Sequence, residues 1–398
     1  DFGNKSITLN GKTHVTWLDA VAKVFARTYD HATDTWSEAF YIDDGYDNHT
    51  NPTLTVDRDG HLRIAYGPHG YWVNWNYARV RYRRSLRPND ASAWSGASDF
   101  GYGATYASMI QLPCGLDAIG YRGGEAPSPA MFQCQRTLGH WTTAKAIFRQ
   151  DIAPQYTHVG PHLAVDSKGR IYYGAHFYNV GAANNDPVNG NKAIMRSWGV
   201  ALAMTPDQGE TWVSLAGDTL NVPVPYSASV SVPPHGEDYR CGGVVIDRAD
   251  RPWVLCWDAT GTRRSLVLNG WTGQEWTSRN VATLLPAGLT PVYACMTIDT
   301  QGSFHIACTA MDSSIDSANA WGHVSSEVFH IVADSSGAPR SCRQVSTSDA
   351  AVCNWLPSIS KPGPFCPIEK PVILYTHGVP GAGCSPETTT EVYCVLPD

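Results

Sequence analysis

The sequence is poor in charged residues, which make up 16% of its 398 positions, against roughly 25% in an average soluble domain. No run approaches the length of about eighteen apolar residues that a membrane-spanning helix needs, so we expect no membrane partner. The formal net charge is −7, which excludes the basic surface of a nucleic-acid-binding protein. What is left is a soluble protein whose partners are neither nucleic acid nor membrane.

The residues that are abundant are those that strands and turns use. The chain contains 36 Gly, 26 Pro, 14 Trp and 19 Tyr, and 11% of its residues are aromatic. Gly and Pro favour turns and the aromatic residues favour strands, while so high an aromatic content excludes intrinsic disorder. The composition therefore predicts an all-β protein.

Eleven cysteines are present and none of them forms a C-x-x-C pair, which zinc ribbons and redox motifs require. We expect most of them to form disulfides in an extracellular, secreted protein, with burial as small hydrophobic residues as the alternative. The start at Asp1-Phe2-Gly3, without Met, agrees with a processed secreted chain. The cysteines are Cys114, Cys134, Cys241, Cys256, Cys295, Cys308, Cys342, Cys353, Cys366, Cys384 and Cys394.

A short phrase recurs along the chain. It consists of an apolar strand end, an Asp-containing turn and a second strand of alternating character, which together indicate a β-hairpin. Its copies begin at Val56-Asp57, Val165-Asp166, Ile246-Asp247 and Ile298-Asp299. A tryptophan phrase recurs between them, at Trp36, Trp94, Trp141, Trp212 and Trp276. The stretch Thr205 to Trp212 resembles the Asp-box turn of propeller blades.

The spacing of the hairpin phrase predicts a β-propeller. Asp247 and Asp299 are 52 residues apart, and Asp57 and Asp166 are separated by 109, or two such units. Four short strands at this period form one propeller blade. We therefore predict a single domain over 1–398, a seven-bladed β-propeller of four-stranded antiparallel blades. The insertion between Asn179 and Asn191 leaves six or eight blades as alternatives, and a pair of β-sandwiches is the main competitor.

Two histidines flank a predicted hairpin. His49 precedes its first strand and His69 follows the second, so both imidazoles are expected at the same mouth of the propeller, where loops form binding surfaces. Asn48 and Asn51 lie beside His49. An imidazole that titrates near neutral pH suits acid–base chemistry, and a loop histidine with ordinary hydrogen bonds is the alternative.

The next two blades add further polar groups at comparable positions. Tyr106 is followed by Tyr121-Arg122, where two glycines come after the arginine and would let a ligand approach the backbone closely. The planar guanidinium suits a carboxylate, although a surface ion pair is an equal alternative. Tyr156 and His162 lie ahead of the following hairpin. We expect these side chains to form an acid–base site with an anion clamp.

Other chemistries fit less well. The chain has no P-loop, no G-x-S-x-G elbow and no H-E-x-x-H helix. We expect no cofactor in catalysis, and zinc at the segment His235 to Cys241 is a minority alternative. A structural calcium ion in the propeller channel, bound by carbonyl oxygens, would leave almost no trace in the sequence and stays open.

Three stretches resemble one known family. Asp47-Asn48-His49-Thr50-Asn51 through His61 to Gly67-Pro68-His69-Gly70, then Tyr82-Arg83-Arg84-Ser85, and Thr105-Tyr106 with Tyr121-Arg122, are similar to the BNR-4 type propeller proteins. This group includes ulvan lyases and enzymes that act on rhamnose linked α-1,4 to glucuronate. The compact, cysteine-rich chain looks most like the fungal L-rhamnose-α-1,4-D-glucuronate lyases, which act on arabinogalactan such as gum arabic.

The resemblance implies a role for each predicted residue. Arg122 would neutralise the uronate carboxylate, His49 or His69 would remove the C5 proton, and Tyr106 would protonate the leaving oxygen or assist the base. The remaining residues expected to contact substrate are Asn48, Asn51, Tyr121, Tyr156 and His162. The expected partner is a uronate-containing polysaccharide or oligosaccharide, the products are rhamnose and a 4,5-unsaturated glucuronate, and the protein is expected to be a monomer.

Three other functions compete with this interpretation. A hydrolase of the same linkage would need two carboxylates, for which Asp43, Asp44, Asp47 and Glu125 are available. A sialidase would need three arginines around one carboxylate, and no N-terminal Arg-Ile-Pro segment is present. A propeller lectin would repeat its site around the ring, whereas the His-Tyr-Arg cluster is confined to neighbouring blades. Ulvan lyase activity is the alternative within the lyases.

Overall fold

The structure is a computed structural model that carries no ligands. It describes residues 3–45, 47–67, 79–101, 103–123, 128–149, 157–179, 196–234, 239–258, 265–315, 322–380 and 389–396. Within these ranges no helix is long and apolar enough to cross a membrane, and the helical element is the 3-10 turn η3 (Val281–Leu284). The predicted all-β class is confirmed.

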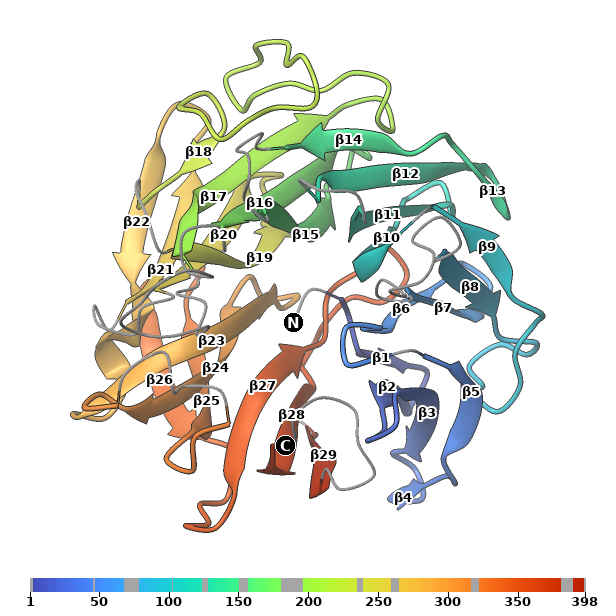
Figure 1. Ribbon diagram of the computed structural model, residues 1–398, viewed down its shortest axis with the longest axis vertical. Helices are drawn as coiled ribbons and strands as arrows, with labels where there is room; N and C mark the ends of the chain where they lie inside the picture. The colour runs from blue at the N-terminus through green and yellow to red at the C-terminus, as the bar shows by residue number, and fades with distance from the viewer. Residues whose placement is uncertain are drawn as a thin grey trace, which may run out of the picture.

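Seven antiparallel sheets form a ring, which confirms the predicted seven-bladed propeller (Figure 1). The first three blades are β1 (Ser6–Leu9), β2 (Lys12–Leu18), β3 (Lys23–Asp30), β4 (Thr35–Trp36) and β5 (Phe40–Asp44); β6 (Thr53–Val56), β7 (Leu62–Tyr66), β8 (Val80–Arg84) and β9 (Ser98–Phe100); and β10 (Thr105–Gln111), β11 (Asp117–Arg122), β12 (Ala130–Thr137), β13 (His140–Trp141) and β14 (Lys145–Phe148).

The other four blades continue around the ring in chain order. They are β15 (Thr157–Val165), β16 (Ile171–Asn179), β17 (Arg196–Thr205) and β18 (Ser231–Val232); β19 (Tyr239–Ile246), β20 (Pro252–Asp258), β21 (Leu266–Trp271) and β22 (Trp276–Asn280); β23 (Leu289–Ile298), β24 (Phe304–Asp312), β25 (Glu327–Ala333) and β26 (Pro339–Gln344); and β27 (Cys353–Ile359), β28 (Ile373–Val379) and β29 (Thr389–Val395). The first strand of each blade faces the centre (Figure 1).

The recurring aspartate phrase is a tight turn closed by the aspartate itself. Asp57 Oδ1 accepts hydrogen bonds from the N–H groups of Asp59 and His61, at 3.0 and 2.9 Å. This side chain replaces the backbone partners that a hairpin turn lacks. The same pair of bonds, two and four residues ahead, recurs at Asp166, Asp247, Asp299 and Asp334. The turn at Asp334 joins β25 and β26 and was not predicted.

Hydrophobic clusters fill the spaces between neighbouring blades. The largest aromatic members lie between blades 3 and 4, where Phe132 and Trp212 meet edge to face at 5.3 Å between ring centres. Trp212 is 1% exposed, and burying a side chain of this size contributes roughly 1.5–3 kcal/mol. Of the tryptophans predicted at one blade position, Trp36, Trp141 and Trp276 lie in fourth strands.

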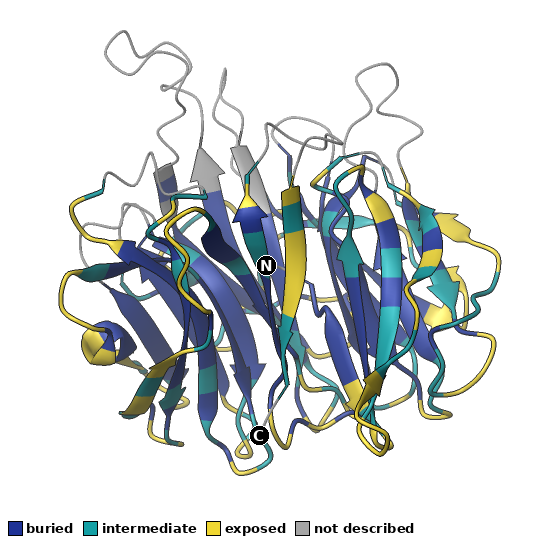
Figure 2. Cartoon of the chain, turned by 90° about the horizontal axis from the view of Figure 1, so that it is seen from below, coloured by how far each residue is buried: buried dark blue, intermediate teal, exposed yellow. Residues whose placement is uncertain are grey.

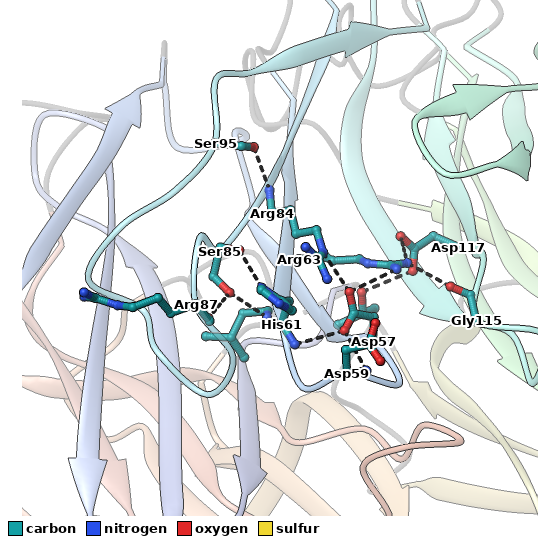
Figure 3. Close-up of polar contacts among 12 residues, drawn as sticks. Asp57, Asp59, His61, Arg63, Arg84, Ser85, Arg87, Ser95, Gly115 and Asp117 are labelled. Atoms are coloured by element: carbon teal, nitrogen blue, oxygen red, sulfur yellow. Dashed lines mark hydrogen bonds and ion pairs between the residues drawn. The ribbon is translucent and has the colours of Figure 1, made fainter.

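A buried polar network links blade 2 to blade 3. The Arg63 guanidinium, 3% exposed, lies between Asp57 and Asp117, at 3.2 and 2.8 Å (Figure 3). Tyr82 donates a hydrogen bond to Asp117 and Arg84 donates to Asp57. Both carboxylates are thus compensated by cations, which a buried charge requires.

The expected disulfides do not occur among the described residues. None of the ten cysteines in the described residues forms a disulfide, and Cys384 lies outside those residues. Seven of the ten are buried within the blades, so they pack as small hydrophobic side chains. The cysteine count therefore gives no support to an oxidising compartment, and the extracellular location stays a prediction.

Candidate active site

The loop between β5 and β6 presents His49. Gly45 begins this loop, and a Cβ atom there would lie 2.4 Å from the Ala22 carbonyl oxygen, so only glycine fits. The His49 N–H donates to Asp47 Oδ1 at 2.8 Å, and His49 Nδ1 lies 3.2 Å from the same oxygen. Asp47 therefore holds the backbone at His49 and places a carboxylate beside its ring.

Residues of blades 2 and 3 donate hydrogen bonds to backbone carbonyl groups of the same loop. Thr105 donates its hydroxyl to the His49 carbonyl oxygen at 2.9 Å, and Gly67 donates its N–H to the Thr50 carbonyl at 3.1 Å. A Cβ atom on Gly67 would lie 2.5 Å from the Ala104 carbonyl oxygen. Close packing of these backbones places the end of β7, in blade 2, against the start of β10, in blade 3.

Tyr106 lies directly after Thr105, at a bulge in β10. Its φ is 54°, in the left-handed region that a tyrosine rarely adopts. The register of β10 with β11 pairs Thr105 with Arg122 and resumes only at Ser108. Strained backbone of this kind costs about 1–3 kcal/mol and clusters at functional sites. The bulge turns the Tyr106 ring toward the His49 loop.

Three predicted residues come together here. The ring centres of His49 and Tyr106 are 5.5 Å apart, and the Arg122 guanidinium carbon lies 4.8 Å from the centre of the Tyr106 ring. His49 retains 34% side-chain exposure, whereas Arg122 is 4% exposed. An imidazole and a phenol accessible from solvent thus lie over a buried positive charge, an arrangement that suits proton transfer next to a bound carboxylate.

Asn48 and Asn51 lie on either side of His49 in the same loop. Asn48 is exposed, and Asn51 is 8% exposed with its Oδ1 accepting from Lys5 Nζ at 2.5 Å. Burial lowers the pKa of Lys5 to about 7. Lys5 was not predicted as a site residue, since nothing in its local sequence marks it and it is 46 positions from Asn51.

Two other predicted substrate contacts lie in the interior. Tyr121 is 1% exposed and donates its hydroxyl to Gln133 Oε1 at 2.7 Å. His162 is 2% exposed, and burial together with the charge of Lys361 lowers its pKa well below the usual value. Both side chains are almost fully buried, as Arg122 is, and their contact with a substrate stays a prediction. His69 and Tyr156 lie outside the described residues.

Two of the carboxylates considered for a hydrolase, Asp43 and Asp47, are engaged in other contacts. Asp43 Oδ2 accepts from Tyr66 at 2.6 Å and from Arg83 at 2.8 Å, and it lies 3.1 Å from Arg81. These partners outweigh the cost of burial and lower the pKa of Asp43. Asp47 contacts His49, and Glu125 lies outside the described residues.

No group of three or more metal-binding side chains occurs in the described part of the chain. The predicted calcium ion in the channel is not tested by this observation, because carbonyl oxygens would bind it.

Comparison with known proteins supports the predicted resemblance. In sequence, the chain is 27% identical over 146 residues to an ulvan lyase of Alteromonas sp. (strain LOR), which is 32% of this chain and 30% of that protein. It is 26% identical over 143 residues to an ulvan lyase of Nonlabens ulvanivorans, which is 31% of this chain and 30% of that protein. These matches span about 30% of the length of the curated relatives.

In structure, the chain resembles a PL25 ulvan lyase with a TM-score of 0.70 at 15% identity, over 98% of this chain and 91% of the other. The same measures apply to that lyase bound to -[GlcA(1-4)Rha3S]-. This likeness establishes the fold. Residues 12–284 match the model of BNR_4, described as a BNR repeat-containing family member, and the protein belongs to that family.

Proposed function

We propose that this protein is a polysaccharide lyase that cleaves the bond between rhamnose and a uronate by β-elimination. The observation that carries the proposal is the contact of His49, Tyr106 and Arg122. The ulvan lyases among the relatives support the same class of reaction.

The first step removes the proton at C5 of the uronate. A carboxylate beside C5 destabilises the carbanion that develops, and the buried Arg122 counters this charge at short range and low dielectric. The Asp47 carboxylate favours a proton on the near nitrogen of His49, Nδ1. The lone pair is then on Nε2, which takes the C5 proton.

The second step breaks the C4–O bond. The electron pair released at C5 forms the C4–C5 double bond, and the oxygen at C4 leaves with the departing sugar. Tyr106 donates its phenolic proton to this oxygen, since its ring contacts both His49 and Arg122. The products are a sugar with a free hydroxyl and a 4,5-unsaturated uronate. His49 and Tyr106 return to their starting protonation by exchange with water.

For the polysaccharide, we favour ulvan over gum arabic. The relatives with matching sequence are ulvan lyases, and the structural relative was bound to a glucuronate–rhamnose sulfate unit. The predicted rhamnose caps of arabinogalactan contain the same type of linkage and form the second candidate. Either polymer is found outside cells, and on this ground we propose an extracellular enzyme.

The test is digestion of ulvan and of gum arabic while the far-ultraviolet absorbance of the unsaturated uronate is followed. A rise in absorbance, lost in His49→Ala and Arg122→Ala, supports the lyase. Release of reducing sugar without the chromophore would contradict it and favour the hydrolase. The polymer that gives the higher kcat/KM identifies the preferred substrate.

A further inference from the structure

The ring is closed between blade 1 and blade 7 without a shared strand. Within the described residues blade 7 has three strands, β27 to β29, whereas blades 1 and 3 each have five. Figure 2 views the molecule from the side on which these blades meet, and β29 lies there as a largely exposed outer strand. The outer part of blade 1 consequently faces a blade that is short of one strand.

The face of blade 1 that turns toward this gap is aromatic. Alternation along β2 and β3 places Trp17, Phe25, Arg27 and Tyr29 on one face, while Val24 and Ala26 point into the cluster shared with blade 2. Cross-strand pairing adds Trp36, opposite Tyr29, and Tyr41, opposite Phe25. Trp17 and Trp36 pack against the cluster of Val15, Val372 and Leu374 between blades 1 and 7 and remain partly exposed. A row of partly exposed rings of this kind marks a binding surface.

Contacts within this face hold the rings in place. Trp17 stacks on Phe25 with 5.7 Å between ring centres, and the Arg27 guanidinium lies 5.4 Å from the centre of the Trp36 ring. Arg27 Nε donates to the Ser37 carbonyl at 2.6 Å. Neither Trp17 nor Trp36 is fully buried. The surface is therefore ordered before any ligand arrives, which lowers the entropy cost of binding.

Two adjoining cavities follow the junction of the two blades. The outer one, of about 440 Å³, is lined by Trp17, Trp36 and Arg27 from blade 1 and by Glu391 and Tyr393 from β29. The inner one, of about 230 Å³, is lined by Lys5, Asn48 and Asn51. Trp17, Leu374 and Val392 line both. We call the two together the seam groove.

The inner cavity is bordered by the loop that carries His49, although His49 itself is not among its lining residues. Asn48 and Asn51, which line it, flank His49 in the same loop. A polymer with one residue at His49 would therefore meet the inner cavity first and the outer cavity next. Rings flanked by a few amide, cationic and carboxylate groups are what a pyranose chain requires, with an apolar ring face and hydroxyls at its edge.

We propose that the seam groove binds the polysaccharide chain that continues from the uronate at His49. This inference rests on the proposed function and assigns the direction in which the substrate runs, across blade 1 toward blade 7. Trp17 and Trp36 would stack on successive sugar rings, and Lys5 and Arg27 would favour acidic residues of the chain. The groove would then determine the preference for long over short substrates.

The test uses the inactive His49→Ala protein and purified ulvan oligosaccharides, a tetrasaccharide and a dodecasaccharide, in calorimetric titrations. We expect the dodecasaccharide to bind more tightly, and Trp36→Leu in this background to weaken it about tenfold while leaving the tetrasaccharide unchanged. Trp276→Leu is the matched control, because Trp276 is also partly exposed in a fourth strand and contacts another tryptophan, Trp271.

In the active enzyme, Trp36→Leu should raise KM for the long substrate and leave kcat unchanged. Equal affinity of the Trp36→Leu and Trp276→Leu proteins for the dodecasaccharide would overturn the inference. A dimer seen in sedimentation and dissociated by Trp36→Leu would also overturn it, because a second copy of the chain would then occupy the groove. If ulvan gives no unsaturated product but the length dependence persists, the proposed lyase fails and the glycan-binding groove stands.

Discussion

The guanidinium carbon of Arg122 lies 4.8 Å from the centre of the Tyr106 ring, and this contact crosses from one strand of blade 3 to the next. The bulge in β10 makes it possible, since the left-handed backbone of Tyr106 turns its ring toward both Arg122 and His49. Tyr106 thus contacts both Arg122 of its own blade and His49 in the loop between β5 and β6.

Arg122 should be needed for turnover more than for folding. In Arg122→Lys we expect kcat to fall by about a hundredfold or more, because an ammonium does not reproduce the planar contact with a carboxylate. Kinetics on ulvan measure the effect. A matched change at an exposed pair, Arg87→Lys, should leave kcat unaltered. Full activity in Arg122→Lys would contradict the proposed role of Arg122 in binding the uronate carboxylate.

Tyr106 should act through its hydroxyl rather than its ring. Tyr106→Phe keeps the ring contacts with His49 and Arg122 but removes the proton donor, so kcat should fall by about a hundredfold. KM should change little. If Tyr106→Phe retains the activity of the parent enzyme, another group protonates the leaving oxygen.

Asp47 should support catalysis without touching the substrate. Asp47→Asn retains the oxygen that accepts the His49 N–H but loses the charge next to Nδ1, so we expect kcat to fall by about tenfold. Asp47→Ala, which also loses the backbone contact, should fall further. A larger effect on KM than on kcat would argue against this role.

The network in Figure 3 should contribute to stability alone. Asp117→Ala leaves the buried Arg63 without one of its two carboxylates, and we expect a loss of about 3–5 kcal/mol in the free energy of unfolding. Urea denaturation measures this. Asp90→Ala, which breaks the exposed pair with Arg87, should cost about 1 kcal/mol or less.

Acid should destabilise the fold through buried histidines. Burial, with the charge of Arg240, lowers the pKa of His176 from 6.5 to about 3, and burial lowers that of His330 to about 4. Between about pH 6.5 and about pH 4 the unfolded chain binds protons that the native state does not, so the free energy of unfolding falls as the pH falls.

Urea titrations across this interval test the assignment. His176→Gln should reduce the slope of the free energy of unfolding against pH by about one proton, and His140→Gln, at an exposed position, should leave it unchanged. A slope unaffected by His176→Gln would assign the acid sensitivity to other groups.

The features predicted correctly depend on local sequence. The aspartate turns follow from one side chain that bonds to backbone two and four residues ahead, so each copy is visible in the sequence. His49, Tyr106 and Arg122 were placed together because each lies at the end of a predicted strand, and the ends of neighbouring blades meet.

The features that were missed depend on three-dimensional packing. The sequence could not show that Tyr121 packs in the core while its neighbour Arg122 faces the Tyr106 ring, because neighbours in a strand point to opposite faces. Lys5 and Asn51 are 46 positions apart, and only the tertiary structure brings them together. The cysteine spacing could not distinguish paired from buried thiols.

Each blade consists of one continuous stretch of chain, including the blades on either side of the junction that carries the seam groove. A gene encoding such a ring can gain, lose or exchange a whole blade without cutting any sheet. The described strands of blades 1 and 7 do not pair with one another, so the substrate preference can diverge at this junction while the pairing within each blade is retained.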